Sequence, residues 1–260
     1  MTQLRFILPL LDMPCTHFVD VFGGSGAVIL NRPPAPVETY NDMDGELCNF
    51  FRVVRDHPNE IIRLLSYTPY SREEFKIACH YLKKNDQTIS PIERARLYFT
   101  KAKMTFLGMC QTNNSWSNSK KDSKKGMAES VSSWHGSVDM ISRISNRLLR
   151  VQIENAPALR LIKRLDSPDT LFYCDPPYPF DQRQMKSKAY QFEMSNDDHE
   201  ELAEVLGQCV GKVAISFYNN EPLLIERLYP SKKWKRNLGE SKVVNNTSKT
   251  IRQELVLTNY

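Results

Sequence analysis

The chain has 260 residues and a formal net charge of +5, with 41% hydrophobic and 25% charged residues. This size suits one large α/β domain, or one domain with a sizeable insertion, and the composition excludes a disordered protein. No apolar run reaches the ~18 residues of a bilayer span. Pro9 and Asp12 interrupt the N-terminal apolar stretch, and no small-residue cleavage site follows it, so we predict neither a membrane anchor nor a signal peptide.

The six cysteines are scattered and form no Cys-x-x-Cys pair. This pattern argues against a zinc site and against a disulfide framework, and it predicts a reducing, cytoplasmic setting.

The first piece of the chain reads as strand, glycine turn, helix and strand. Apolar residues at 17–22 predict a strand, residues 23–26 a glycine turn, residues 37–42 a second strand, and residues 45–56 a helix. This βαβ order predicts a parallel sheet covered by helices.

Residues 57–150 change to a helical pattern and are predicted to be an insertion. Apolar residues recur at helical spacing over 73–84 and 91–109, and a further helix is predicted around 138–149. A polar loop rich in serine and lysine, residues 111–134, lies between them.

The basic excess of the chain is concentrated in this insertion. Between Lys101 and Arg150 there are nine lysines and arginines but three acids. Such a patch attracts a polyanion through phosphate neutralisation and counterion release, although a solvated loop explains residues 120–125 about equally well. Trp116 and Trp134 flank the lysines and are predicted either to stack on DNA or wedge into it, or to anchor the loop to the helices.

From residue 151 onward, strands and helices alternate again. Strands are predicted at 151–155, 170–175 and 212–217, helices at 158–165 and 197–209, and a β-rich tail at 254–260. We therefore expect the sheet to be complete only when both α/β pieces come together. His199 lies among acids on the second of these helices and is predicted to be a surface histidine, because no partner cluster accompanies it.

A nucleoside ligand is predicted at the end of the first strand. Glycines after Phe22 let the backbone turn sharply and approach a ligand, and the following helix start offers free N–H groups; a purely structural turn is the alternative. The next strand ends in Asn41 and Asp42, where a carboxylate can accept from ribose hydroxyls or cap the next helix. The turn has neither G-x-G-x-x-G spacing nor a Walker lysine, which favours an adenosine cofactor without a pyrophosphate.

The stretch Asp175-Pro176-Pro177-Tyr178 follows a hydrophobic strand, at the edge where open parallel sheets bind ligands. The two prolines donate no backbone hydrogen bond and hold the backbone extended, so a carbonyl can point into the cleft. The Asp175 carboxylate and a proline carbonyl would accept both hydrogens of an exocyclic amino group, and Tyr178 would stack on the base. The alternative is a proline-rich loop with a capping aspartate and a packed tyrosine.

Four segments in this order, FVDVFGGSG, YNDMD, LFYCDPPY and RQELVLTNY, resemble the Dam-type DNA adenine-N6 methyltransferases, particularly their phage and prophage branch. The resemblance runs from Leu4 to Tyr260. It implies a Rossmann-like α/β sheet dependent on S-adenosylmethionine, divided between residues 1–56 and 151–260, with residues 57–150 as a helical target-recognition domain. Restriction–modification and phage biology are the expected context.

The resemblance implies methyl transfer from S-adenosylmethionine to N6 of an adenine flipped out of double-stranded DNA. The resemblance also implies that the protein works in the cytoplasm of a bacterium or of a phage-infected host. It implies an enzyme that requires no metal and can act as a monomer. The implied catalytic residues are Asp175, Pro176, Pro177 and Tyr178. The implied cofactor-binding residues are Asp20, Phe22, Gly23, Gly24, Ser25, Gly26, Asn41, Asp42 and Asp175. The implied DNA-binding residues are Asn113, Asn114, Trp116, Lys120, Lys121, Lys124 and Lys125.

Two features common in that family are absent from this sequence. Members usually open with a lysine-containing segment, which implies either a longer parent chain or a cofactor pocket lacking one wall. They also commonly carry an acidic residue after the strand at 151–155, where this chain continues with Ala156. Cytosine-N4, RNA-adenine or protein-amide methylation would use a similar acceptor pair and stays open, as does a DNA-binding relative that has lost catalysis.

Overall fold

The computed structural model describes residues 2–84, 88–105, 115–119, 121–122, 126–177, 194–219, 222–245 and 250–260, which form two compact units. The first unit contains the described residues up to Met43 and from Val151 onward. The second contains those from Asp44 to Arg150. The helix at 45–56, which the sequence pattern grouped with the first α/β piece, therefore packs with the helices of the insertion.

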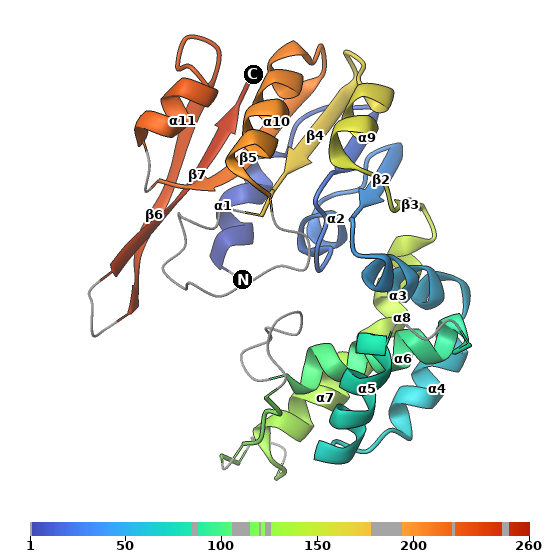
Figure 1. Ribbon diagram of the computed structural model, residues 1–260. Helices are drawn as coiled ribbons and strands as arrows, with labels where there is room; N and C mark the ends of the chain where they lie inside the picture. Colours follow the sequence, from blue (N-terminus) through green and yellow to red (C-terminus); the bar gives the residue numbers. More distant parts are fainter. Residues whose placement is uncertain are drawn as a thin grey trace. The chain divides into compact units, whose positions relative to one another are not determined.

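The first unit is built on one sheet, whose strand order within the described residues is β3-β2-β1-β4-β5-β7-β6 (Figure 1). The pairs β3–β2, β2–β1, β1–β4 and β4–β5 are parallel, and β7 runs antiparallel to β5 and β6. Because β1 pairs with β4, the two pieces complete one Rossmann-like sheet, as predicted. The strands are β1 (His17–Asp20), β2 (Val37–Asn41), β3 (Val151–Glu154), β4 (Thr170–Cys174), β5 (Lys212–Tyr218), β6 (Lys235–Asn245) and β7 (Thr250–Thr258).

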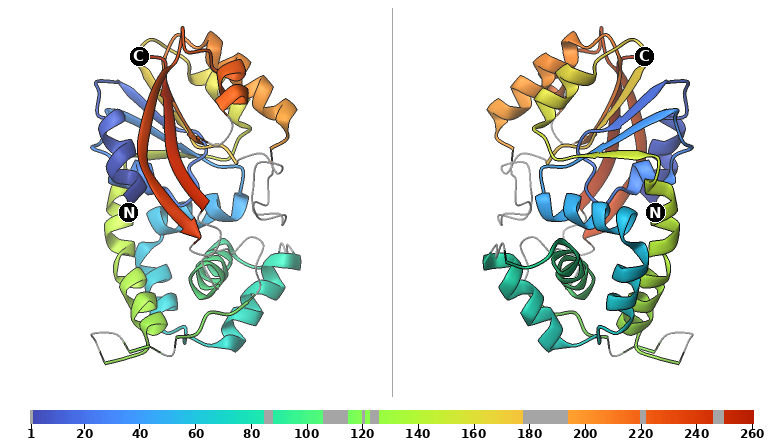
Figure 2. Two further views of the ribbon diagram at one scale, coloured as in Figure 1. Left: turned by 90° about the vertical axis from the view of Figure 1, so that its left-hand side faces the viewer. Right: turned by 90° about the vertical axis from the view of Figure 1, so that its right-hand side faces the viewer.

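Helices cover both faces of this sheet. Figure 2 shows α1 on one side of the strands and α9, α10 and α11 on the other. The hydroxyl of Tyr260 donates to the carbonyl of Leu10 at 2.7 Å, which ties the end of α1 to the end of the chain. The helices of this unit are α1 (Thr2–Leu10), α2 (Ala27–Asn31), α9 (Ala158–Leu165), α10 (Asn196–Gln208) and α11 (Pro222–Leu228). Helix α1, a segment described from sequence only as an apolar stretch, was not predicted.

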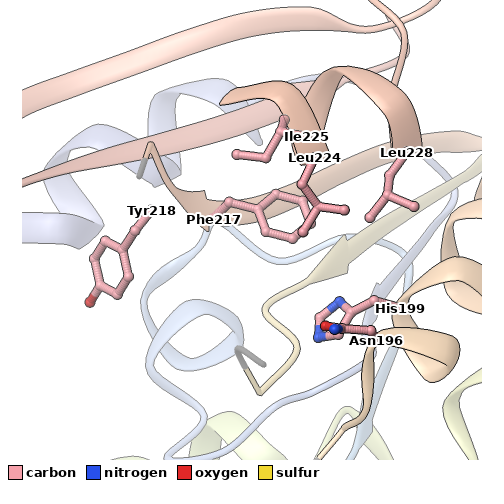
Figure 3. Close-up of a pocket in the computed structure, with 7 residues that line it drawn as sticks. All are labelled: Asn196, His199, Phe217, Tyr218, Leu224, Ile225 and Leu228. Atoms are coloured by element: carbon pink, nitrogen blue, oxygen red, sulfur yellow. The ribbon is translucent and has the colours of Figure 1, made fainter. Parts of the chain in front are cut away.

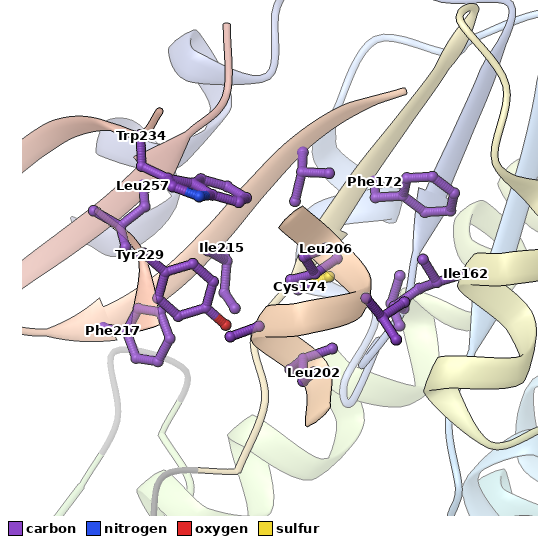
Figure 4. Packing of buried hydrophobic residues seen from close by; sticks show 14 of the residues in the cluster. Ile162, Phe172, Cys174, Leu202, Leu206, Ile215, Phe217, Tyr229, Trp234 and Leu257 are labelled. Carbon is purple, nitrogen blue, oxygen red and sulfur yellow. The ribbon is translucent and has the colours of Figure 1, made fainter. Parts of the chain in front are cut away.

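The main core lies between the sheet and the helices α9, α10 and α11 (Figure 4). Side chains alternate along a strand, so Phe172 and Cys174 of β4 and Ile215 of β5 face Leu202 and Leu206 of α10. All five are almost completely buried. Burying a side chain of the size of leucine or phenylalanine contributes roughly 1.5–3 kcal/mol, so this layer fixes the ends of β4 and β5 against α10.

The second unit is helical, and half-buried ion pairs join its helices. Arg94 of α6 pairs with Glu46 of α3, and Arg96 of α6 pairs with Glu74 of α5 at 2.8 Å. The helices are α3 (Gly45–Asp56), α4 (Pro58–Ser66), α5 (Arg72–Lys84), α6 (Pro91–Met104), α7 (Glu129–Asp139) and α8 (Ile141–Leu148). None of the helices in the described parts of either unit is long and apolar enough to cross a membrane.

Three sequence-based boundaries in this unit were wrong. Helix α6 ends at Met104 rather than at residue 109, because Thr105 has extended backbone angles. Helix α7 begins at Glu129, inside the loop predicted at 111–134. The serines and the glycine of α7 have low helix propensity and therefore favoured a loop. Burial of Trp134 in this unit stabilises the helix instead. The single helix expected around 138–149 is broken at Met140 into α7 and α8.

Candidate active site at the carboxyl edge of the sheet

Strand order reverses between β1 and β4, since β2 and β3 lie beyond β1 and β5 lies beyond β4. Open α/β sheets bind ligands outside the carboxyl ends of their strands at such a point. Asp20 is the last residue of β1 and stands opposite Tyr173 of β4. Asp175 directly follows β4. The two carboxyl groups therefore lie on adjacent strands at the edge of the sheet where a ligand is expected.

The glycine turn after β1 is pressed against Tyr40, the penultimate residue of β2. A Cβ atom on Gly23 would lie 2.2 Å from the Tyr40 ring, and the Tyr40 hydroxyl donates to the carbonyl of Gly24 at 2.6 Å. Gly24 and Gly26 have φ values of 49° and 69°, a region that disfavours side chains with a Cβ. The turn therefore requires glycine at these positions. Tyr40 was not predicted as a site residue, and its only signal in the sequence is an aromatic residue next to the polar end of a strand.

Asp42 and Phe22 make different contacts next to this turn. The Asp42 carboxylate accepts from the backbone N–H of Gly24 at 2.8 Å, which ties the turn to the end of β2. Phe22 packs half-buried against the main core, and Ser25 is exposed. The alternative of a helix cap at Asp42 was wrong: the N-cap of α3 is Asp44, which accepts from two backbone N–H groups of that helix.

Asn41 joins the ends of three strands. Its side-chain amide donates to the carbonyls of Val21 and Ala156 at 2.9 and 3.1 Å, and its oxygen accepts from the N–H of Ala156 at 2.9 Å. Asn155 adds a bond from its side chain to the carbonyl of Asp42 at 2.7 Å. Both amide hydrogens of Asn41 are used within the protein, so this residue holds the ends of β1, β2 and β3 together. Ala156 stands where related proteins commonly carry an acidic residue. It contributes to this network through its backbone N–H and carbonyl groups.

Asp20 is the most unusual group of the site. Its side chain is buried, and its Oδ2 atom has no hydrogen-bond partner among the residues that the structure describes. Burial raises the pKa of this carboxyl to about 7; a backbone hydrogen bond from Ile29 opposes the rise, and the negative charges of Asp175 and Asp42 add to it. Buried acceptors in proteins are normally satisfied. A buried carboxyl with one unpaired oxygen, close to two further acids, fits a ligand that brings a positive charge or a hydrogen-bond donor.

The Asp175-Pro176-Pro177 segment lies in sequence between the end of β4 and the start of α10. Asp175 is exposed, Pro176 is buried and Pro177 is half-buried. The carbonyl oxygen of Pro177 lies 2.9 Å from Nε2 of His199 in α10. Tyr178, predicted to stack on the target base, lies outside the described residues.

His199 is buried, with 2% of its surface exposed, so its interpretation as a surface histidine was wrong. It shares the buried face of α10 with Leu202, Ala203 and Leu206, which follow it at the i+3, i+4 and i+7 spacing of a helix face. That spacing was readable from the sequence. The acids on both sides of the histidine, which lie on the other faces of the helix, concealed it.

The predicted DNA-binding residues fall on a part of the second unit that is described only in places. Lys121 is exposed, whereas Asn113, Asn114, Lys120, Lys124 and Lys125 lie outside the described residues.

Two tryptophans in this part of the chain pack against neighbouring side chains. The Trp116 ring lies 5.9 Å from the ring of Tyr70, and the guanidinium of Arg72 lies 4.8 Å from its centroid. Trp134 is buried, with its ring 5.3 Å from that of Phe99. These contacts favour the anchoring interpretation of both tryptophans.

No group of three or more histidine, cysteine, aspartate or glutamate side chains that could hold a metal ion occurs in the described part of the chain.

A parallel sheet with a glycine turn and three carboxyl groups at its switch point defines a Rossmann-like, nucleotide-binding class of protein. Within that class, residues 2–243 match the family described as D12 class N6 adenine-specific DNA methyltransferase, and the chain belongs to that family. It is therefore an enzyme that methylates adenine in DNA. The family decides against the cytosine, RNA and protein-amide targets that the acceptor pair alone left open.

This chain is also similar to individual known proteins. The "Type II methyltransferase M1.LlaDCHI" of Lactococcus lactis subsp. cremoris is 25% identical over 279 residues, an alignment that covers 98% of this chain and 92% of the relative. Among solved structures, the "Putative methyltransferase yhhF from Escherichia coli" aligns with 100% of this chain and 85% of its own length. Its TM-score of 0.39 and identity of 11% are too low to bear on fold or function.

Proposed function

We propose that the enzyme transfers a methyl group from S-adenosylmethionine to N6 of an adenine flipped out of double-stranded DNA, at the carboxyl edge of β1, β2 and β4. The observation that carries this proposal is the set of three acids, Asp20, Asp42 and Asp175, around a turn that only glycine can form. A base within a duplex cannot be reached, so the target must leave the stack at a cost of a few kcal/mol.

The residues on the β1 and β2 side fit this cofactor. S-adenosylmethionine supplies a methyl group on a positively charged sulfur, and it also carries an ammonium group. Asp20 offers a buried carboxyl with an unpaired oxygen, which a cation or an N–H donor would satisfy. The Gly23–Gly26 turn allows close backbone approach. Asp42 is the acceptor proposed for the ribose hydroxyls, while Asn41 holds the floor of the site.

The residues after β4 would hold the target amino group. His199 contacts the Pro177 carbonyl, so the Asp175 carboxylate and the Pro176 carbonyl are the acceptor pair that we propose for the two N6 hydrogens. Accepting both hydrogens would leave the nitrogen lone pair available to an electrophile such as the methyl group. Forming the nitrogen–methyl bond would break the methyl–sulfur bond and leave a neutral thioether. The methylated nitrogen would then carry a positive charge and be acidic, so Asp175 could accept one proton from it without being a strong base. Tyr178 would stack on the base.

DNA binding is proposed for the second unit. Residues 44–150 carry 18 lysines and arginines against 11 acids, whereas the rest of the chain carries 17 against 19. A polyanion is therefore attracted to the helical unit and not to the sheet, where its phosphates would meet the acids of the site. Alignment of the reacting atoms, rather than acid–base strength, is expected to supply most of the rate gain.

The first test is methyl transfer from labelled S-adenosylmethionine to unmethylated duplex DNA, followed by digestion to nucleosides and mass analysis. N6-methyladenine should form with the wild-type chain and fall to background with Asp175→Ala. A parallel titration of the protein with S-adenosylmethionine separates loss of binding from loss of chemistry. If the protein binds DNA but neither binds S-adenosylmethionine nor forms product, the proposed use of this cofactor by this chain is wrong.

A further inference from the structure

His199 is not one of the groups that the predicted reaction uses, yet it touches the segment that carries the acceptor pair. Its Nε2 atom lies 2.9 Å from the Pro177 carbonyl oxygen. A carbonyl oxygen can only accept a hydrogen bond, so Nε2 must carry the hydrogen and donate. The tautomer of this buried imidazole is therefore fixed by its partner.

The start of α10 holds this imidazole in place. Ser195 caps the helix by accepting from the N–H of Asp198 at 3.1 Å, and the Asp198 carboxylate accepts in return from the N–H of Ser195 at 2.7 Å. This capping box fixes the first turn of the helix. It places His199, one residue further on, on the buried face that packs against the sheet.

Apolar side chains border His199 on the side that faces α11. Figure 3 shows His199 and Asn196 of α10 facing the side chains of α11 across a small pocket. The pocket is lined mainly by apolar groups, which are Phe217, Leu224, Ile225 and Leu228. Because His199 is 2% exposed, bulk water cannot readily take the place of its N–H at the Pro177 carbonyl.

A single hydrogen bond constrains the orientation of the Asp175-Pro176-Pro177 segment more than it would constrain an ordinary loop. Its two prolines have no N–H groups, so they cannot fix their own orientation through backbone donation. A bond to the second proline carbonyl therefore constrains how the carbonyl before it and the Asp175 carboxylate are presented. Misplacement of reacting groups by about 1 Å can cost 100-fold in rate.

We propose that His199 is a positioning residue: its Nε2–H anchors the Pro177 carbonyl to α10 and so orients the neighbouring acceptors toward the target amino group. This role rests on the proposed function of Asp175 and Pro176. It does not require His199 to touch the base, the cofactor or the transferred proton.

Two substitutions separate this role from simple core packing. His199→Gln keeps an N–H donor at a similar reach, whereas His199→Leu keeps an apolar volume without a donor. We expect His199→Leu to lower kcat about 10- to 100-fold, with KM for DNA and affinity for S-adenosylmethionine within about 3-fold of wild type. His199→Gln should recover kcat to within about 5-fold. Val205→Ala, on the same helix, should lower stability but leave kcat unchanged.

The proposal is overturned if His199→Leu keeps the wild-type kcat, or if His199→Gln is as slow as His199→Leu. A second readout does not depend on turnover. In protein labelled with ¹⁵N-histidine, one of the five histidines should show a slowly exchanging Nε2 proton that both variants lack. Its absence would also contradict the proposal. If the wild type forms no N6-methyladenine while this signal is present, the proposed function fails and the contact itself stands.

Discussion

Acidic side chains are used differently in the two units. In the helical unit, Glu46 and Glu74 pair with arginines of α6, so their charge is neutralised inside the protein. At the carboxyl edge of the first unit, Asp20 is buried with an unpaired oxygen, and burial raises its pKa. A paired acid stabilises helix packing, whereas an acid whose burial is uncompensated marks a place where a ligand is expected. The contrast agrees with the proposed roles of the two units, in which the helical unit binds DNA and the edge of the sheet carries the reaction.

The largest effect should come from Asp175. Replacing it with alanine removes one of the two proposed acceptors, and we expect turnover to fall by about 1,000-fold or more, roughly 4 kcal/mol in activation free energy. DNA affinity should change by less than about 3-fold, because the second unit supplies the basic charge. Asp169→Ala, which changes an exposed acid at the opposite end of β4, is the matched control and should remain active. Retained turnover in Asp175→Ala would refute its catalytic role.

A second effect concerns the pH dependence of stability. The folded pKa of Asp20 is about 7 and its unfolded pKa about 3.9, so the folded protein binds the extra proton. This group therefore opposes folding increasingly as the pH rises from about 4 to about 7.

Asp20→Asn removes this dependence. Between pH 5 and pH 8 the stability of the variant, measured by denaturant unfolding, should improve relative to the wild type by about 2–3 kcal/mol. A difference that does not change with pH would show that the carboxyl is already ionised at pH 5. Affinity for S-adenosylmethionine should decrease in the same variant.

Replacing a glycine with alanine should change the unfolding free energy in opposite directions in the two units. In Gly23→Ala the new Cβ meets the Tyr40 ring, so we expect a loss of about 2–3 kcal/mol in unfolding free energy and weaker cofactor binding. Gly136→Ala lies inside α7 with no atom within 4 Å of the new Cβ, and should stabilise the protein by about 0.5–1 kcal/mol. Wild-type cofactor affinity in Gly23→Ala would contradict the role of the turn.

The smallest effect tests the charge of the second unit. Replacing Lys120, Lys121, Lys124 and Lys125 with alanine should weaken DNA binding and reduce the salt slope of the association constant by up to about 3 to 4. Turnover at saturating DNA should not change. A matched control replaces four exposed lysines of the first unit, which are Lys163, Lys232, Lys233 and Lys235. Equal losses in both variants would mean that binding depends on net charge and not on this segment.

The sequence by itself determined the parallel sheet, its completion by two separated pieces, the glycine turn and the position of Asp175 after β4. These features depend on local chemistry: glycine permits the turn, proline removes donors, and alternating apolar residues specify strands. The start of α7 was missed because its serine- and glycine-rich sequence favours a loop, whereas burial of Trp134 stabilises a helix.

Only the tertiary structure decided how the site is supported. Asn41 reaches Ala156, 115 residues away, and Tyr40 holds the turn at Gly24. The pKa of Asp20 depends on burial among other elements, and His199 meets Pro177 across 22 residues. Each of these properties arises from groups brought together by packing. A pattern along the chain can place a carboxylate at the end of a strand, but its protonation and its partners depend on what the fold packs around it.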